Sequence, residues 1–274
     1  MEKKKEIMID DTTNYDSSTL WNTPAFSRKE GKAFSEIDFV HKLIGQKPAG
    51  TLIDVGACIG RSSRLFLESG WTVYGFEPDP SNRARLKQNL QDFSAFTCDP
   101  RAVDEVSGKS VSFFTSTESI GISSLAPFTT GHKKTTSVET VSLRDYCKEQ
   151  SIKSVDVLKI DAEGYDLMVL KSFPWESIRP SVVTAEFENK KTVELLGYDT
   201  LDLANFLTEM NYIVYFSEWH PILRYGTPHD WRCFRPYPYQ PKIDSWGNII
   251  AFRDKQDESI LLKTLKENIR LKRK

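Results

Sequence analysis

The stretch TLIDVGACIG, residues 51–60, decides the fold. It begins with an apolar run of the length of a buried strand, and small residues follow at Gly56, Ala57 and Gly60. Glycine lets a backbone turn tightly and approach a ligand closely, and a helix that begins after such a turn directs its unpaired N–H groups at that ligand. The stretch therefore predicts a strand, a ligand-binding loop and a helix in direct succession.

The rest of the chain continues this alternation. Apolar residues at helical spacing, such as Leu86 with Leu90 and Leu203 with Leu207, separate further apolar runs. Strands that alternate with helices pair in parallel through right-handed crossovers. We therefore predict an α/β fold with one doubly wound, mostly parallel, Rossmann-like sheet and helices on both faces. The further predicted strands are TVYGFE (72–77), SAFTCD (94–99), VDVLKID (155–161), SVVTAEFE (181–188), YIVYFSE (212–218) and GNIIAFR (247–253).

The domain organisation follows from where this pattern begins and where it is interrupted. We expect a flexible, polar arm over residues 1–32 and a single domain over residues 33–274. Residues 104–143 predict an antiparallel insertion after the third strand. Residues 218–246 are rich in Trp, Tyr, Pro, His and Arg, and they predict a long irregular loop of the kind that forms a lid or a substrate wall.

Charge and cysteine content narrow the class of protein. Lys plus Arg, 37, nearly balance Asp plus Glu, 38, so no global positive field favours nucleic acid as a partner. The four cysteines lie far apart, which fits a reducing cytoplasm. No apolar run suits a signal peptide or a membrane span, so we expect a cytoplasmic protein without stable membrane insertion. The segment from Leu261 predicts an amphipathic terminal helix, either solvated or weakly membrane-seeking.

Acidic residues at the strand ends predict how a nucleoside would bind. Glu77 ends the second strand twenty-one residues after Gly56, where a carboxylate accepts two hydrogen bonds from a ribose diol. The Asp54 carboxylate, just before the loop, suits a cationic portion of such a ligand. Asp99 fits two interpretations, a hydrogen bond to the adenine amino group or a turn residue before Pro100.

The motifs resemble one family in particular. The loop G-A-C-I-G lacks the G-x-G-x-x-G pattern of dinucleotide-binding proteins and resembles the D-V-G-x-x-x-G loop of class I methyltransferases. Three longer segments resemble the FkbM family of methyltransferases, although Cys58 stands where that family commonly has Asn. The resemblance implies methyl transfer from S-adenosylmethionine to a hydroxyl of a sugar, a glycan or a glycosylated metabolite. The segments are TLIDVGACIGRSSRLFLESGWTVYGFEPDP (51–80), SSLAPF with VETVSLRDY (123–128 and 138–146) and DVLKIDAEGYDLMVLKSF (156–173).

A sugar hydroxyl is barely acidic, so its methylation needs a general base or a metal ion. Asp161 ends the fourth strand, at the edge where open α/β sheets bind ligands, and is the first candidate for the base. His220 and His229 are further candidates because imidazole titrates near neutral pH. Trp219 or Trp231 could stack on a sugar face.

A metal site is a second possibility for the same chemistry. Asp161, Glu188 and Asn189 follow two neighbouring strands, an arrangement similar to the magnesium site of catechol O-methyltransferase. Mg²⁺ or Mn²⁺ would suit these oxygen ligands. In the alternative interpretation, these residues and Glu163 are helix-cap and loop residues without a metal. Two other functions also stay open, an NAD-linked oxidoreductase and a non-catalytic cofactor-binding module, although no Y-x-x-x-K pair supports the first of them.

Overall fold

The computed structural model describes residues 32–45, 47–116, 121–128, 130–224, 227 and 229–271. The expected N-terminal arm over residues 1–32 lies outside the described residues, apart from its last residue. All seven predicted strands are present, and each lies within two residues of its predicted bounds at either end. An eighth strand, which the sequence pattern did not predict, extends the same sheet.

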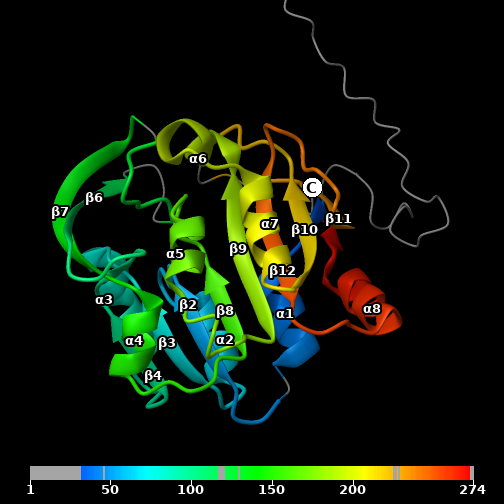
Figure 1. Ribbon diagram of the computed structural model, residues 1–274, viewed down its shortest axis with the longest axis horizontal. Coiled ribbons are helices and arrows are strands. Elements are labelled where there is room, and N and C mark those ends of the chain that lie inside the picture. The colour runs from blue at the N-terminus through cyan, green and yellow to red at the C-terminus, as the bar shows by residue number, and fades with distance from the viewer. Residues whose placement is uncertain are drawn as a thin grey trace, which may run out of the picture.

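The central sheet contains eight strands (Figure 1). They are β2 (Thr51–Val55), β3 (Thr72–Phe76), β4 (Phe96–Asp99), β8 (Val157–Ile160), β9 (Val182–Glu188), β10 (Ile213–Trp219), β11 (Trp231–Pro236) and β12 (Trp246–Phe252). Their order is β11-β10-β12-β9-β8-β2-β3-β4. The strands from β9 to β4 pair in parallel, whereas β12 is antiparallel to β9 and β10, and β11 is antiparallel to β10. The direction of winding reverses between β2 and β8, which is where doubly wound sheets bind ligands.

Eight helices belong to the described chain. They are α1 (Glu36–Ile44), α2 (Arg61–Leu67), α3 (Pro80–Asn89), α4 (Leu143–Glu149), α5 (Asp166–Ser172), α6 (Asn189–Leu196), α7 (Thr200–Glu209) and α8 (Glu258–Asn268). One hydrophobic cluster joins α4, α5 and α7 to one face of the sheet, and a second joins α1, α2, α3 and α8 to the other. The predicted arrangement of helices on both faces is therefore confirmed (Figure 1).

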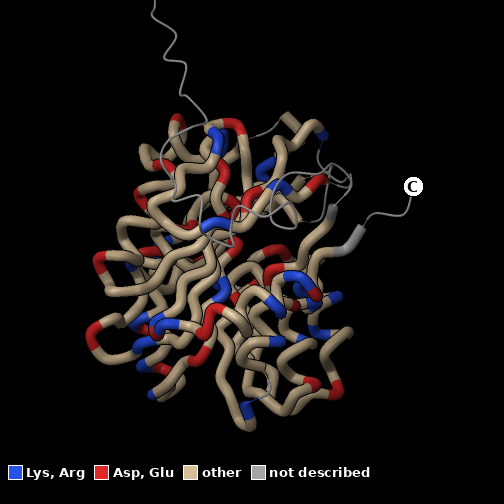
Figure 2. The backbone as a smooth tube through the Cα atoms, turned by 90° about the vertical axis from the view of Figure 1, so that its right-hand side faces the viewer, with Lys and Arg blue, Asp and Glu red and all other residues tan. Residues whose placement is uncertain are grey.

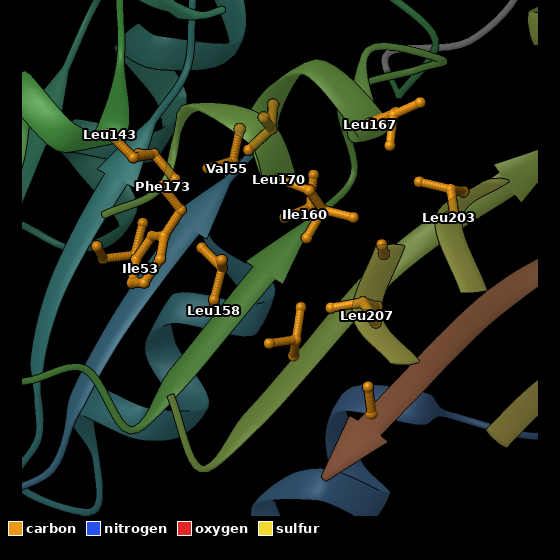
Figure 3. Packing of buried hydrophobic residues seen from close by; sticks show 14 of the residues in the cluster. Ile53, Val55, Leu143, Leu158, Ile160, Leu167, Leu170, Phe173, Leu203 and Leu207 are labelled. Atoms are coloured by element: carbon orange, nitrogen blue, oxygen red, sulfur yellow. The ribbon is translucent and has the colours of Figure 1, made fainter. Parts of the chain in front are cut away.

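Strand alternation explains how one strand serves both clusters. Ile53 and Val55 of β2 lie beside Leu158 and Ile160 of β8 in the cluster with α4, α5 and α7 (Figure 3). Leu52 points to the opposite cluster, because successive strand side chains alternate between faces. All five side chains are buried. Apolar side chains on both faces of these strands are what a parallel strand covered on both faces requires.

Two smaller sheets lie outside the central one. Where an insertion was expected, β5 (Ala102–Val103), β6 (Ser110–Ser116) and β7 (His132–Val141) form a three-stranded sheet in the order β5-β7-β6. The β6–β7 pairing is antiparallel, and β7 arches away from the main body (Figure 1). A short antiparallel pair, β1 (Lys32–Ala33) with β13 (Arg270–Leu271), joins the two ends of the described chain.

The structure corrects the prediction of a long irregular loop over residues 218–246. The segment contains all of β11, whose Trp231 and Phe234 are fully buried in the core. The sequence pattern failed here because Arg232 interrupts the apolar run. Arg232 is itself buried and pairs with the buried Glu218 of β10 at 3.3 Å. The charge that makes this segment look unlike a core strand in the sequence is therefore neutralised inside the sheet.

The apolar face of the C-terminal helix α8 packs inside the protein. Leu261, Leu262 and Leu265 are buried in the cluster that also contains Val40 of α1. No helix in the described part of the chain is long and apolar enough to cross a membrane. Basic and acidic residues are interspersed along the backbone (Figure 2), as the balanced composition predicts. The apolar stripe of α8 is therefore accounted for by packing, and the structure gives no support to the membrane-seeking interpretation.

Candidate active site

A cavity of about 220 Å³ lies at the carboxyl ends of β2, β3 and β8. It thus coincides with the point where the winding direction of the sheet reverses. Residues of five segments line it: the loop after β2, the loop after β3 with the start of α3, strand β5, strand β6 with the segment that follows it, and the loop after β8. The lining residues include Gly56, Cys58, Glu77, Pro78, Asn82, Ser123, Ser124, Leu125, Asp161, Ala162, Glu163 and Tyr165.

The loop of residues 56–60, called the cofactor loop below, requires glycine at two positions. Gly56 has a φ of +75°, and a Cβ there would lie 2.0 Å from the carbonyl oxygen of Asp161. Gly60 has a φ of +89° and is the N-cap of α2, and a Cβ there would lie 2.7 Å from Leu86. The N–H groups of Gly56 and Ala57 both donate to the carbonyl of Phe76, which fixes the loop against β3. Ala57 and Gly60 therefore shape the loop, and Gly56 borders the cavity.

The side chain of Lys159 in β8 fixes the position of the cofactor loop. The Lys159 ammonium of β8 donates to the carbonyl oxygen of Gly56 at 2.8 Å and pairs with Asp54 Oδ1 at 3.1 Å. It also lies 3.6 Å from Asp161 Oδ2. Burial lowers the pKa of Lys159, but the two carboxylates outweigh this effect and the pKa is raised, so the side chain is charged. One cation thus joins the cofactor loop to the end of β8.

Asp54 lies beneath the cofactor loop rather than in the cavity. Its side chain is fully buried, accepts a hydrogen bond from Ser63 at 2.7 Å and pairs with Lys159. It is not one of the residues that line the cavity. The expected contact with a cationic methionine portion is therefore corrected, because the charge of Asp54 is already balanced by the lysine.

Glu77 lies in the cavity wall, as its spacing from Gly56 predicts. One carboxylate oxygen accepts the backbone N–H of Asp79 at 2.8 Å. Burial raises the pKa of Glu77 to about 8. A carboxylate with so little solvent around it needs hydrogen-bond donors, and a ribose diol would supply two of them.

Asp99 adopts the second of its two predicted roles. Its carboxylate accepts the backbone N–H of Arg101 at 2.8 Å, as in an Asx turn, and the Arg101 guanidinium pairs with it at 2.8 Å. The same guanidinium pairs with Glu149. Asp99 does not line the cavity. The structure therefore corrects the adenine interpretation in favour of a turn residue.

The loop after β8 brings two carboxylates to the cavity. The Asp161 side chain is 41% exposed, and Glu163 is buried. Oxygens of Asp161, Glu163 and Glu186 lie within 4.8 Å of one another. Glu163 adopts a φ of +51°, and its carbonyl accepts a hydrogen bond from Ser124 at 3.0 Å. Left-handed backbone is uncommon for glutamate, and such strain is concentrated at functional sites.

The predicted metal ligands do not assemble into one site. Asn189 Oδ1 instead accepts both the backbone N–H and the hydroxyl of Thr200 at the start of α7. Glu188 pairs with Lys191 at 3.0 Å. The carboxylates that gather with Asp161 within 4.8 Å are those of Glu163 and Glu186, and the predicted ligands Glu188 and Asn189 do not belong to this group. This corrects the predicted set, because strand ends that are adjacent in a sheet can direct their side chains to different elements.

Neither predicted histidine lines the cavity. The backbone N–H of His220 donates to the carbonyl of Asp230, and the His229 ring lies edge-on to Trp246 at 5.4 Å. Trp219 stacks on Trp246 at 5.3 Å. These residues lie at the same edge of the sheet as the cavity, because Trp246 pairs with Glu188 at the end of β9 and with Trp219 at the end of β10.

Trp231 is not available for stacking on a ligand. It is fully buried, its ring stacks on Phe34 at 5.2 Å, and its indole N–H donates to Ser217 at 3.0 Å. Trp219 is also buried, with 9% of its surface exposed. The structure thus corrects the prediction that either residue stacks on a sugar.

Sequence reasoning missed both buried lysines of the site, Lys159 and Lys191. Lys159 stands in an otherwise apolar strand, directly before the residue pair Ile160-Asp161, and a charged residue there is a signal in retrospect. Lys191 lies in the first turn of a helix, where a lysine is ordinarily solvated, so no local pattern distinguishes it. The contribution of Ser123 and Ser124 was not predicted either, because their segment reaches the cavity only through the small sheet.

The comparisons with known proteins agree with the sequence motifs. Solved structures with a similar arrangement include a precorrin-6y C5,15-methyltransferase from Geobacter metallireducens GS-15 (TM-score 0.41, 12% identity, 83% of this chain and 93% of that chain covered). They also include a magnesium protoporphyrin IX methyltransferase from Synechocystis PCC 6803 (TM-score 0.39, 12% identity, 80% and 78% covered). No curated protein matches the chain. A family model for the FkbM methyltransferase domain matches residues 54–214, more than half of the 274 residues. The chain therefore belongs to the FkbM methyltransferase family.

Proposed function

We propose that the protein transfers a methyl group from S-adenosylmethionine to a hydroxyl of a sugar, a glycan or a glycosylated metabolite. The observation that supports this proposal is that one cavity is lined both by residues suited to a nucleoside and by an accessible carboxylate. Gly56 and Glu77 form a wall suited to a nucleoside, and Asp161 lies on another wall of the same cavity. Cofactor and acceptor would thus meet at the carboxyl ends of β2 and β8, where proximity and orientation contribute most to the reaction.

The residues fit the cofactor through shape and hydrogen bonding. A side chain at Gly56 would clash with the Asp161 carbonyl, so glycine keeps this wall open and the backbone accessible. Glu77 is placed to accept hydrogen bonds from a ribose. The helix α2 begins at Arg61, directly after the cofactor loop, with Gly60 as its N-cap. When bound, S-adenosylmethionine supplies a methyl group that is already activated by its sulfonium, so the protein mainly has to align the acceptor and exclude water.

Asp161 is the proposed proton acceptor. Its side chain is 41% exposed, which leaves it accessible to a hydroxyl in the cavity. The Lys159 ammonium lies 3.6 Å from one of its oxygens and so limits the positions that the carboxylate can adopt. The carboxylate would accept a hydrogen bond from the acceptor hydroxyl and take its proton as the oxygen becomes methylated.

The acceptor would extend along the sheet edge toward β12 and β10. Trp246 pairs with Glu188 of β9, so it lies two strands from β8, a separation on the order of 10 Å. His229 packs against Trp246, and Glu36 of α1 accepts hydrogen bonds from Trp219 and Ser217 at 2.7 Å. The half-buried Trp246 indole beside the His229 imidazole suits a ring that bears several hydroxyls.

Transfer of tritium-labelled methyl groups to a panel of methyl glycosides tests the proposal. The panel should contain hexoses, deoxyhexoses and amino sugars, with short peptides and phenols as the other acceptor classes. We expect label in at least one glycoside. Asp161→Asn should reduce the rate by a factor on the order of 10² to 10⁴, the usual contribution of a general base. The exposed Asp92→Asn is the matched control and should leave the rate unchanged.

Binding measurements separate this proposal from the two other functions. Calorimetry should show binding of S-adenosylhomocysteine and none of NAD, because the cofactor loop lacks the dinucleotide fingerprint. Cofactor binding without transfer to any acceptor class would favour the non-catalytic module. Label only in peptides or phenols would contradict the sugar assignment while leaving the methyltransferase activity in place.

A further inference from the structure

The Lys191 ammonium lies inside a cluster of glutamates beside the cavity. It is 2.5 Å from Glu163 Oε2, 3.0 Å from Glu186 Oε2 and 3.0 Å from Glu188 Oε2. The lysine side chain is only 3% exposed. The ring of Phe128 lies 5.0 Å from the ammonium, within the range of a cation–π contact. Lys191 is therefore a deeply buried charge that is fully enclosed by complementary groups.

The cluster connects separate parts of the active site. Glu163 follows β8 and lines the cavity, whereas Glu186 and Glu188 belong to β9. Lys191 comes from the first turn of α6, and Phe128 from the segment between β6 and β7. Since the ammonium contacts all of them, it holds the carboxyl ends of β8 and β9 together at the cavity wall.

We infer that the Lys191 ammonium is a permanent internal cation that occupies the place between the ends of β8 and β9 where the sequence predicted a divalent metal ion. The oxygens that come nearest to forming a metal site belong to Asp161, Glu163 and Glu186. Two of these three residues are already paired with Lys191. A divalent ion would have to displace the ammonium from both carboxylates or accept its repulsion at close range.

Lys191 is a positioning residue and not a catalytic one. It does not line the cavity, but its partner Glu163 does. Glu163 has a left-handed backbone, which glutamate rarely adopts, and it is held at two points. Ser124 donates to its carbonyl, and Lys191 donates to its carboxylate. The lysine thus fixes the position of a carboxylate at the cavity wall, as a metal ion would, without a metal.

Manganese binding tests this inference directly and needs no knowledge of the acceptor. Electron paramagnetic resonance of free Mn²⁺ should show no binding to the wild-type protein at this cluster. Lys191→Met removes the ammonium and leaves the glutamates available, so we expect Mn²⁺ to bind at least about tenfold more tightly than to the wild type. Lys191→Arg keeps a cation in place and should behave like the wild type. S-adenosylhomocysteine binding by calorimetry shows which variants are folded.

A buried charge without its partner can prevent folding, so a second variant is needed. Lys191→Gln combined with Glu188→Gln removes one charge of each sign and still leaves the three carboxylates of the nearest set. Gain of Mn²⁺ binding in either folded variant supports the inference. Stoichiometric Mn²⁺ binding to the wild type that is lost in Glu163→Gln would overturn it, as would two folded variants that bind no Mn²⁺. Failure to methylate any glycoside would refute the proposed function and leave this result unaffected.

Discussion

The Lys159 ammonium donates a hydrogen bond of 2.8 Å to the carbonyl oxygen of Gly56. Lys159 belongs to β8 and Gly56 follows β2, so the bond crosses the point where the winding of the sheet reverses. Through Lys159 the cofactor loop is also connected to Asp161, the proposed proton acceptor. The position of the loop and the position of the Asp161 carboxylate therefore depend on the same side chain.

Replacement of this lysine should weaken both folding and cofactor binding. Lys159→Met leaves the buried Asp54 without its counter-ion, which costs on the order of 3 to 5 kcal/mol of unfolding free energy. The cofactor loop also loses a charged hydrogen bond, so S-adenosylhomocysteine affinity should fall by roughly tenfold or more. Urea denaturation and calorimetry measure the two effects. The exposed Lys153→Met is the control and should change neither.

The double variant Lys159→Met with Asp54→Asn distinguishes the charge effect from the loop effect. If the stability loss comes from the unpaired Asp54, the second substitution should restore part of the unfolding free energy. It should not restore cofactor affinity, because the hydrogen bond to the Gly56 carbonyl stays absent. Strictly additive effects on stability would show that the ion pair is not the origin of the loss.

Cofactor affinity should rise with pH up to about 8. Burial raises the pKa of Glu77 from 4.5 to about 8, so the folded protein without cofactor holds a proton there over that range. If the ribose binds the ionised carboxylate, binding releases this proton, and affinity rises by at most about tenfold per pH unit below the pKa. Calorimetry in buffers of different ionisation enthalpy measures the proton release. Glu77→Gln should abolish it and make the affinity nearly independent of pH.

The raised pKa of Glu77 also predicts that the free energy of unfolding depends on pH. The unfolded chain binds fewer protons at Glu77 than the folded protein between pH 4.5 and about 8, so the unfolding free energy contributed by this residue falls as pH rises through that window. Glu77→Gln should flatten this part of the pH profile. An identical slope in the wild type and the variant would assign the pH dependence to other groups.

Gly56→Ala should damage the site far more than an alanine at an unconstrained glycine. The added Cβ would lie 2.0 Å from the Asp161 carbonyl, so either the cofactor loop or the loop after β8 has to move. We expect a loss of cofactor affinity of about tenfold to a hundredfold, and a loss of about 2 to 4 kcal/mol in unfolding free energy. Gly70 has a similar φ of +80° with no atom within 4 Å of the added Cβ. Gly70→Ala should cost only about 1 kcal/mol and leave cofactor affinity unchanged.

Substitutions at the sheet edge should separate a structural aromatic residue from an acceptor contact. Trp231→Ala removes a fully buried indole and should cost about 3 to 5 kcal/mol of unfolding free energy. His229→Ala should leave stability nearly unchanged and reduce acceptor turnover, with S-adenosylhomocysteine affinity intact, because His229 lies outside the cofactor cavity. Thermal unfolding and glycoside methylation measure the two properties. Equal turnover by wild type and His229→Ala would remove this histidine from the acceptor site.

Local pattern alone was sufficient for most of the fold and for the prediction that Gly56 and Glu77 lie at one edge of the sheet. The runs around Ile53 and Leu158 are mostly apolar because parallel strands are buried on both faces, and this signal depends only on neighbouring residues. Gly56 and Glu77 were also predictable, since the ends of adjacent parallel strands meet at one edge. Spacing along the chain therefore determined the sheet and the edge of the sheet at which the cavity lies.

Tertiary structure decided which charges face the cavity and which neutralise one another. Asp54 and Asp161 both lie near the cofactor loop, yet only Asp161 reaches the cavity, because Lys159 lies between them. Lys191 pairs with Glu163 beside the cavity, and Arg232 of the core strand β11 pairs with Glu218 of β10. A buried charge is tolerated only with a partner, and that partner is usually distant in sequence. For this physical reason the sequence determined the architecture, and only the folded protein determined the electrostatics of its active site.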